Sequence, residues 1–384
     1  MRDAGETGAS QRSGESGGVP ALTSRLRQIA AASSIGHDVL SLVSGGLFEL
    51  LGLAPEDAAI AAEVALYAQL SGLESHGLVH LPLYVTGLID GTIRARPLLG
   101  IHRGGTAAAL VDGDRGLGLV VSRKAMDLAI TIAAEHGVGA VAVRNSSHFG
   151  AAGYYGDLAA QHGMIGIAMS NAAPAIAPTG GVTALLGTNP IGVGVPLGAG
   201  EPMVLDMATS MVARSRIRQS LAAGEASIPE GWALDAAGNP TTEAAAAIAG
   251  SVMPIGGPKG FGLAALVEFL CSALPDGEPG FAITYENVVK RPSGIGHCFL
   301  ALNPAAFCGV DAFQRRADHV ASVIETSKGR ADAGSPRLPG RRAQDARRAG
   351  LADGIPVGPN LKTALLQTAD LLERRAVDIA GPAP

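Results

Sequence analysis

The sequence predicts an α/β protein of the α+β kind, and three observations support this fold class. The chain has 384 residues, of which 47% are hydrophobic and 16% charged, so it can bury a sizeable core. An apolar stripe at helical spacing follows Pro55. From Ala107 onward, short apolar runs typical of strands alternate with longer segments that carry helix signals.

The N-terminal part of the chain is predicted to be helical after a disordered start. Residues 1–30 contain a Gly/Ser-rich stretch and are expected to form a disordered extension. Helical signals begin near Val39. Pro55 and the two acidic residues after it open a helix that runs towards Gly72, because proline and acids are favoured in a first helical turn.

The remaining elements are predicted from apolar period and from glycine or proline punctuation. After residue 106 we expect, in order, a strand over 107–111, a helix over 122–136, a strand over 138–143, a helix over 150–162 and a strand over 164–169. Residues 235–240 have turn composition, and leucines from Leu263 to Leu274 mark an amphipathic helix. Residues 328–350 are expected to form a loop, and a last helix is expected over 361–376.

Composition excludes several classes of protein. The net charge of -5 leaves no basic excess for a phosphate backbone, so a nucleic-acid partner is not expected. Three cysteines without CxxC spacing argue against a disulfide framework or a sulfur metal site and fit a reducing cytoplasm. The start of the chain lacks the apolar stretch of a signal peptide, and prolines interrupt the uncharged stretch 158–200. We therefore expect a soluble, cytoplasmic protein without a membrane partner.

Neither standard phosphate-binding fingerprint is present. Gly116 and Gly118 begin a G-x-G-x-x-G match but lack the third glycine. The segment ending in Lys259 and Gly260 has no Ser or Thr after the lysine, as a Walker loop requires.

The first segment with polar side chains suited to proton transfer is Ser75-His76-Gly77, followed by His80 and Tyr84. A histidine beside a hydroxyl can be held in one tautomer and exchange a proton near neutral pH. A hydrogen-bonded structural histidine is the alternative. The spacing of His76 and His80 suits metal ligands on a helix, but the motif lacks the glutamate of H-E-x-x-H, so no metal is predicted.

The second such segment contains His148, Phe149 and Gly150. It lies between a predicted strand and a predicted helix, so His148 should stand at the carboxyl end of a strand beside free helix amides. Ser147 could instead serve as a helix N-cap.

Four further segments resemble ligand loops, although a plain structural role is open for each. Lys259 at a helix start would add positive charge to an electropositive position, which suits an anionic ligand. The other three segments centre on Thr188 in G-T-N-P, on Asp206-Met207-Ala208 with Arg214 and Arg216 behind it, and on the basic loop of Arg337, Pro339, Gly340 and Arg341. Together the segments predict an anion-binding site with one or two proton-transfer histidines.

The ordered motifs SHG, HFG, GTNP, DMATS, GGPKGFG and RLPG, from about Leu40 to beyond Leu361, resemble those of the malate/L-lactate dehydrogenase family. The resemblance implies a helical substrate domain, a non-Rossmann NAD(P)-binding domain with a largely antiparallel sheet, and a homodimer. It implies a helical substrate-domain part over 31–105, the NAD(P)-binding domain over 106–262 and a C-terminal part over 263–384 that returns to the substrate domain. The implied activity is hydride transfer between nicotinamide C4 and C2 of a 2-hydroxy or 2-oxo carboxylate, with NAD or NADP.

The resemblance also assigns roles to motif residues. His76 would be the acid/base with Ser75 beside it, and His148 would be the competing proton acceptor. The implied substrate contacts are His80, Tyr84, Thr188, Arg214 and Arg216. The implied cofactor contacts are His148, Phe149, Gly150, Asp206, Met207, Ala208, Lys259, Gly260, Arg337, Pro339 and Gly340.

Two positions depart from the family pattern. The family usually has an arginine where this chain has His80, and an arginine can clamp a carboxylate with two hydrogen bonds. Either Arg214 or Arg216 supplies that charge, or the substrate differs from a simple 2-hydroxy acid. Arg216 stands where cyclic-imine reductases are expected to carry an acid, which argues against an imine. Reduction of a cyclic imine-2-carboxylate and a catalytically inactive NAD(P)-binding homologue are the alternatives.

Overall fold

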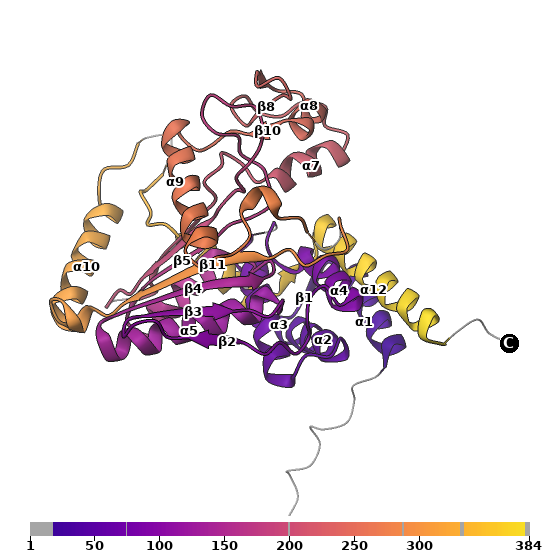
Figure 1. The fold of residues 1–384 in the computed structure, drawn as a ribbon, viewed down its shortest axis with the longest axis horizontal. Helices are drawn as coiled ribbons and strands as arrows, with labels where there is room; N and C mark the ends of the chain where they lie inside the picture. The colour runs from indigo at the N-terminus through magenta and orange to yellow at the C-terminus, as the bar shows by residue number, and fades with distance from the viewer. Residues whose placement is uncertain (1–17, 74, 199, 286–287, 331–333, 381–384) are drawn as a thin grey trace, which may run out of the picture.

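The structure, a computed structural model, describes residues 18–380 except 74, 199, 286–287 and 331–333. The molecule has a central sheet, with a group of helices beside one end of it and a small second unit above it in the view of Figure 1. No helix among these residues is long and apolar enough to cross a membrane.

The central sheet is largely antiparallel, as predicted. Its strand order is β2 (Gly100–His102), β3 (Ala108–Asp112), β4 (Val138–Ser146), β11 (Ile295–Leu302), β5 (Ile165–Ser170), β6 (Ile191–Val195) and β7 (Met203–Met207). Only β3 and β4 run parallel among these neighbours. The predicted domain boundary at residue 262 does not match this sheet, because β11 comes from the C-terminal part and lies in its middle.

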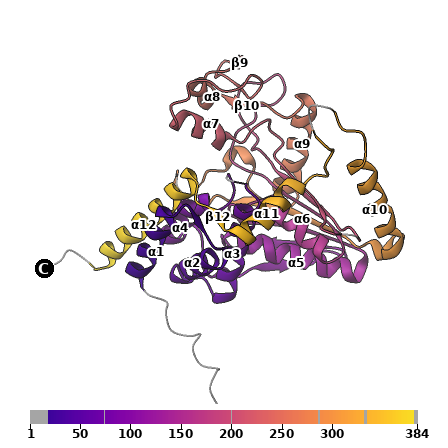
Figure 2. The same cartoon turned by 180° about the vertical axis from the view of Figure 1, so that it is seen from behind.

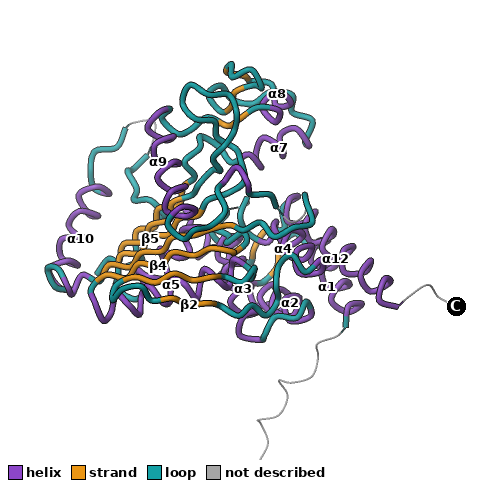
Figure 3. The backbone as a smooth tube through the Cα atoms, viewed as in Figure 1, coloured by secondary structure: helices purple, strands orange, loops and turns teal. Residues whose placement is uncertain are grey.

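Helices cover both faces of the sheet. Neighbouring residues of β11 pack on opposite faces of the sheet. Phe299 belongs to the main core, whereas Cys298 packs with Val267 and Cys271 on the other face. The first face is covered by α5 (Gly118–His136) and α6 (Ala152–Gln161), and the second by α9 (Pro258–Glu268) and the π-helical turn η2 (Phe269–Ala273). Figure 3 shows α5 and α9 on either side of the strands.

Glycines let α6 pack directly on the sheet. A Cβ atom at Gly194 of β6 would lie 2.0 Å from the carbonyl oxygen of Gly156 in α6, so only glycine fits there. The backbones of α6 and β6 are therefore in direct contact at this point.

A helical group forms the other end of the molecule. It consists of α1 (Val19–Ala31), α2 (His37–Leu50), α3 (Pro55–Leu70), the 3-10 turn η1 (Leu78–His80), α4 (Leu81–Asp90) and the C-terminal α12 (Pro359–Ala380). The helix α12 packs against α1 and α4, and β1 (Ser34–Ile35) pairs with β12 (Ile355–Pro356). The C-terminal helix α12 and strand β12 therefore pack against N-terminal elements.

The prediction of disorder over residues 1–30 is wrong for the part that forms α1. Leu22, Leu26 and Ile29 repeat at helical spacing and are buried, and Arg27 bonds Asp370 of α12 at 2.7 Å. The Gly/Ser-rich composition applies only to residues before this helix. Residues 1–17 lie outside the described part of the chain.

The small unit above the sheet has its own core. It contains α7 (Arg214–Ala222), β8 (Ala233–Leu234), β9 (Pro240–Thr241), α8 (Ala244–Ala249) and β10 (Ser251–Val252). The predicted turn over 235–240 joins β8 to β9. It is closed by Asp235, whose carboxylate accepts bonds from the amides of Ala237 and Asn239.

The C-terminal third also contains α10 (Val310–Glu325), α11 (Arg341–Asp353) and the turns η3 (Gly280–Ala282) and η4 (Pro304–Ala306). The prediction of a loop over 328–350 is wrong from Arg341 onward. The helix α11 lacks a broad apolar stripe and is held by charge instead: Arg347 bonds Asp157 of α6 at 2.9 Å. Figure 2 shows α11 beside α6 on the back of the molecule. The other predicted strands and helices are confirmed, with ends shifted by a few residues.

Candidate active site

Three histidines from separate parts of the chain meet between the helical group and the sheet. His76 and His80 lie between α3 and α4, whereas His148 follows the end of β4. The ring centroids of His80 and His148 are 4.6 Å apart, and His76 lies 6.0 Å from each of the others. The predicted proton-transfer residues therefore form one cluster, which we call the histidine cluster.

Two tyrosines complete this cluster. The Tyr84 hydroxyl lies 2.8 Å from Nδ1 of His148, which brings this predicted residue to the cluster. The ring of Tyr285 lies 6.3 Å from that of His148, edge to face. Nothing in the sequence singles out Tyr285, because it follows η3 in a segment without a motif.

Ser75 links the two histidines of the SHG segment. Its hydroxyl lies 2.7 Å from Nδ1 of His76, and its carbonyl oxygen accepts a hydrogen bond from Nε2 of His80 at 2.8 Å. The sequence predicts the first of these bonds. The second comes from the tight turn that leads into η1.

Burial keeps the three rings uncharged. Loss of hydration lowers the pKa of His76, lowers that of His80 to about 4 and lowers that of His148 well below the usual value. Neighbouring histidines add to the last two shifts, since one positive ring disfavours another. At neutral pH each ring can therefore accept a proton.

Among the described residues, no group of three His, Cys, Asp or Glu side chains is arranged to hold a metal ion.

Phe149, the residue after His148, is held in a stack of aromatic rings. Phe149 lies between His297, at 4.8 Å and nearly parallel, and Tyr155, at 5.1 Å. The Tyr155 hydroxyl donates to the Phe149 carbonyl at 2.5 Å. Phe149 is thus buried between these two rings. Its predicted contact with a cofactor stays a prediction. Ser147 bonds the amide of Gly118 at the start of α5 instead of capping the helix after Gly150.

A buried carboxylate holds the Thr188 segment. Glu268 accepts hydrogen bonds from the Asn189 side chain at 3.0 Å and from the Gly280 amide at 2.7 Å. The Thr188 carbonyl accepts bonds from the amide and the hydroxyl of Thr209. Glu268 therefore ties the predicted substrate segment to the loop that leads to Tyr285. No sequence motif marks Glu268, because its role depends on three segments that meet only in the fold.

Two predicted cofactor segments lie side by side. Asp206 and Met207 belong to β7, Ala208 follows that strand, and the Pro339 carbonyl accepts a bond from the Val204 amide of β7 at 3.3 Å. Gly340 has a φ of 91° and packs on the Val204 backbone, where a Cβ atom would lie 2.7 Å from an oxygen. The fold thus joins the DMATS and RLPG motifs.

Asp206 faces the start of α6. Although its side chain is exposed, the surrounding protein removes enough hydration to raise its pKa to about 6, partly offset by the Gly153 amide. Gly153 must be glycine because a Cβ atom there would lie 2.9 Å from that of Asp206. This carboxylate beside a helix start is a polar group that a bound ligand can reach.

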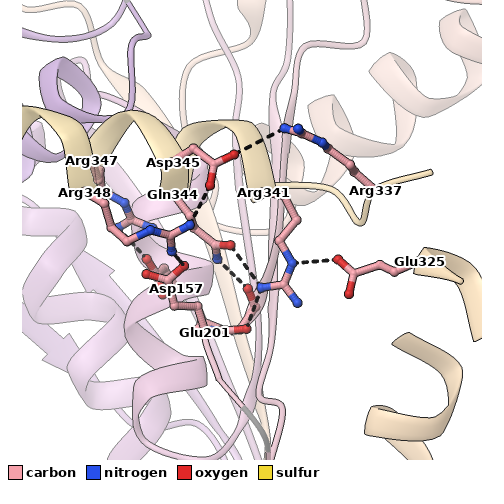
Figure 4. Close-up of polar contacts among 10 residues, drawn as sticks. Asp157, Glu201, Glu325, Arg337, Arg341, Gln344, Asp345, Arg347 and Arg348 are labelled. Carbon is pink, nitrogen blue, oxygen red and sulfur yellow. Dashed lines mark hydrogen bonds and ion pairs between the residues drawn. The ribbon is translucent and has the colours of Figure 1, made fainter. Parts of the chain in front are cut away.

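The basic side chains of the RLPG loop are paired with acids. Arg337 bonds Asp345 at 3.2 Å, and Arg341 bonds Glu325 at 2.8 Å (Figure 4). These bonds anchor the loop to α10 and α11. The predicted contact between Arg337 and a cofactor stays a prediction.

Lys259 differs from these arginines. It lies in the first turn of α9 and is exposed, and no described residue forms an ion pair or hydrogen bond with it. The next residue, Gly260, lets the helix start approach Ile255, whose carbonyl oxygen would be 2.1 Å from an added Cβ atom. A lysine without a described partner at a helix start fits an anionic group such as a cofactor phosphate.

Arg214 and Arg216 contact other parts of the molecule. The Arg214 guanidinium donates to the carbonyls of Pro174 at 3.0 Å and Ile248 at 2.6 Å. The Arg216 guanidinium lies 5.8 Å from the Trp232 ring centroid. Within the described residues, no contact joins either arginine to the histidine cluster, so substrate binding by them stays a prediction.

Comparisons with known proteins agree with the motif order. The family model described as malate/L-lactate dehydrogenase matches residues 36–366. The chain is 40% identical to L-sulfolactate dehydrogenase of Methanocaldococcus jannaschii over 321 residues, which cover 84% of this chain and 92% of that protein. The solved structure of that organism's sulfolactate dehydrogenase matches with a TM-score of 0.82 at 38% identity, over 88% of this chain and 97% of the other.

Two further relatives have related names. Malate dehydrogenase of Pyrococcus abyssi is 42% identical over 286 residues, which cover 72% of this chain and 78% of that protein. (2R)-3-Sulfolactate dehydrogenase (NADP(+)) of Chromohalobacter salexigens is 37% identical over 302 residues, which cover 78% of this chain and 87% of that protein.

Proposed function

The chain belongs to the malate/L-lactate dehydrogenase family, and from that premise we propose that it is an NAD(P)-dependent dehydrogenase of 2-hydroxy carboxylates. The observation that carries the proposal is the histidine cluster with Tyr84. Three uncharged, proton-accepting rings converge beside the carboxyl end of a strand, and the chemistry needs a base next to a hydroxyl group.

His76 is the proposed acid/base. Its Nδ1 is bonded to the Ser75 hydroxyl, whereas no described residue hydrogen-bonds to Nε2, so Nε2 is the ring nitrogen proposed to meet the substrate. In oxidation Nε2 takes the proton of the C2 hydroxyl, and in reduction the protonated ring returns it to the C2 oxygen. A bound nicotinamide supplies the hydride acceptor or donor. His148 is the competing residue for the proton, because its ring faces the same space.

The residues proposed to hold the cofactor come from β7, from the loop before α11 and from the start of α9. Lys259 would meet a phosphate, Asp206 a polar group, and the loop of Pro339 and Gly340 would border the same strand. Comparing NADH with NADPH in the assay distinguishes NAD from NADP as the cofactor.

We expect the purified protein to oxidise NADH or NADPH when given a 2-oxo acid. The assay is the loss of nicotinamide absorbance with a panel of 2-oxo acids and, in parallel, cyclic imine-2-carboxylates. Turnover of the imines alone would replace the proposed substrate class. Binding of NAD(P)H without any turnover would instead indicate an inactive homologue.

We also propose that the chain forms a homodimer. Leu263, Leu266 and Phe269 line one side of α9 and η2 and are 39%, 52% and 68% exposed, which is unusual for a free surface. We expect sedimentation at twice the chain mass and a shift to monomer in Leu266→Glu. The control Leu98→Glu, at an 84% exposed leucine far along the chain, should stay dimeric. A monomeric native protein would contradict the proposal.

A further inference from the structure

We propose that Glu268 is a positioning residue for the reaction, because its carboxylate fixes the segment that brings Tyr285 to the histidine cluster. The inference rests on the proposed function. It gives a role at that site to a buried side chain that acts through another residue.

The carboxylate of Glu268 is hydrogen-bonded at both of its oxygens. Oε1 accepts from the Gly280 amide at 2.7 Å and lies 3.4 Å from the side-chain nitrogen of Asn171, whereas Oε2 accepts from the side-chain nitrogen of Asn189 at 3.0 Å. Glu268 is only 9% exposed, and a buried carboxylate needs such donors in place of water. Each bond ties the segment of its donor to the end of α9.

The Gly280 segment depends directly on this carboxylate. Among the described residues, the Gly280 amide has no other acceptor. A Cβ atom at Gly280 would lie 2.9 Å from Oε2 of Glu268 and 3.1 Å from the carbonyl oxygen of Ala172, so the chain packs tightly against the carboxylate here. Asn171, which also approaches Glu268, holds the nearby carbonyl of Glu278 at 2.9 Å.

The Thr188 segment has other anchors. The Asn189 side chain also donates to the carbonyl oxygen of Ala264 at 2.9 Å. The Thr188 carbonyl accepts from both the amide and the hydroxyl of Thr209. A change in the Glu268 carboxylate is therefore expected to displace the Gly280 segment first.

A short stretch of chain joins Gly280 to the histidine cluster. Gly280 opens the turn η3, where its carbonyl accepts from the Ile283 amide at 3.1 Å. Tyr285 follows this turn, and its ring lies edge to face with that of His148 at a centroid distance of 6.3 Å. A shift of the Gly280 backbone therefore reaches the Tyr285 ring and its contact with His148.

Arg291 provides a second, exposed anchor for the same stretch. Its guanidinium donates to the Thr284 hydroxyl at 2.9 Å and to the carbonyl of Ala282 at 2.5 Å. The residues just before Tyr285 are thus fixed by one buried group and one exposed group.

The variant Glu268→Gln tests the hydrogen bonds without a large change of shape. Glutamine has a donor nitrogen in place of one acceptor oxygen, so either Gly280 or Asn189 then faces another donor. With the 2-oxo acid that the native protein reduces fastest, we expect kcat/KM to fall by about tenfold or more, because small displacements of positioned groups are costly. The Kd of NADH or NADPH, measured by fluorescence titration, should stay unchanged. The residues proposed to hold the cofactor form no described bond with this carboxylate.

A double-mutant cycle distinguishes a positioning role from a purely structural one. In a Tyr285→Ala background, Glu268→Gln should cause little further loss of kcat/KM, because residues that act through one another are not additive. An equal loss in both backgrounds would overturn the inference, since the carboxylate would then act without Tyr285.

The matched control is Ser272→Ala. It removes a buried hydrogen bond to the backbone carbonyl of Glu268 at 2.7 Å and leaves the carboxylate in place. This variant should lower the Tm and keep the native kcat/KM. An equal fall of kcat/KM in Ser272→Ala and Glu268→Gln would show that general loosening of this region, and not the carboxylate, lowers the rate.

The variant Arg291→Met keeps the test independent of whether Glu268→Gln folds. It removes the exposed anchor, so it should lower kcat/KM in the native background and not in Tyr285→Ala. If the native protein reduces no 2-oxo acid, the proposed function itself is wrong. If the native protein is active and Glu268→Gln, or Arg291→Met in its place, keeps the native kcat/KM, the dehydrogenase activity stands and the assignment of Glu268 is overturned.

Discussion

Replacing His76 with alanine is expected to lower kcat by about 10²-fold or more while the protein stays folded. The reason is that Nδ1 of this ring is bonded to Ser75, whereas Nε2 has no partner among the described residues and is the nitrogen proposed to exchange the proton. The side chain is partly exposed and its polar bond is to the neighbouring residue, so truncation removes little from the core. Steady-state kinetics in both directions and a thermal melt would measure the two effects.

The matched control is His162→Ala. This exposed histidine follows α6 and bonds the carbonyl of Leu158, so its loss should leave kcat unchanged. The pH profile gives a second readout. Because burial lowers the pKa of His76, oxidation should lose rate only at pH values below the ordinary histidine pKa of about 6.5. If His76→Ala turns over at the native rate, the proton passes through another group, and His148→Ala is the next variant to measure.

The local parts of the site could be predicted from the sequence. A strand followed by the polar segment around His148 and then a helix places that histidine at a strand end, and the structure confirms this position. The bond between Ser75 and His76 joins neighbouring residues, so the local sequence is sufficient to predict it. In both cases the determining contacts lie within a few residues along the chain.

The remaining parts depend on contacts between distant segments. Glu268 and Tyr285 acquire a role only because the chain beyond α9 returns to the sheet and inserts β11 between β4 and β5. No pattern of spacing predicts that insertion. Charge pairing depends on the fold in the same way: Arg337 pairs with Asp345 of α11, a contact that the basic composition of the loop does not predict.

Acid is expected to unfold this protein at a pH higher than carboxylate titration alone would require. Loss of hydration lowers the pKa of four histidines: His76, His80 at about 4, His148, and His297 at about 3. In the unfolded chain each titrates near about 6.5, so below that pH the unfolded state binds more protons and the native state loses stability. At about pH 5 the loss is about 2 kcal/mol for a histidine that stays neutral in the native state.

One group opposes this trend. The pKa of Asp206 is raised to about 6, so the native state binds its proton first and gains stability as the pH falls. The side chain is exposed, which reduces the gain, and one carboxylate does not offset four histidines. The free energy of unfolding should therefore fall between pH 7 and pH 5, by about 2 kcal/mol for each ring that stays neutral, less the gain from Asp206.

Urea unfolding at a series of pH values and constant protein concentration measures this fall. The variant His80→Gln removes one of the four groups, so its stability should decline by about 2 kcal/mol less over the same interval. A native curve that stays flat from pH 7 to about 5.5 would show that the rings are not held neutral in the fold. That result would also weaken His76 as a base, because the burial that makes the folded protein sensitive to acid is the same burial that keeps the ring free of a proton at neutral pH.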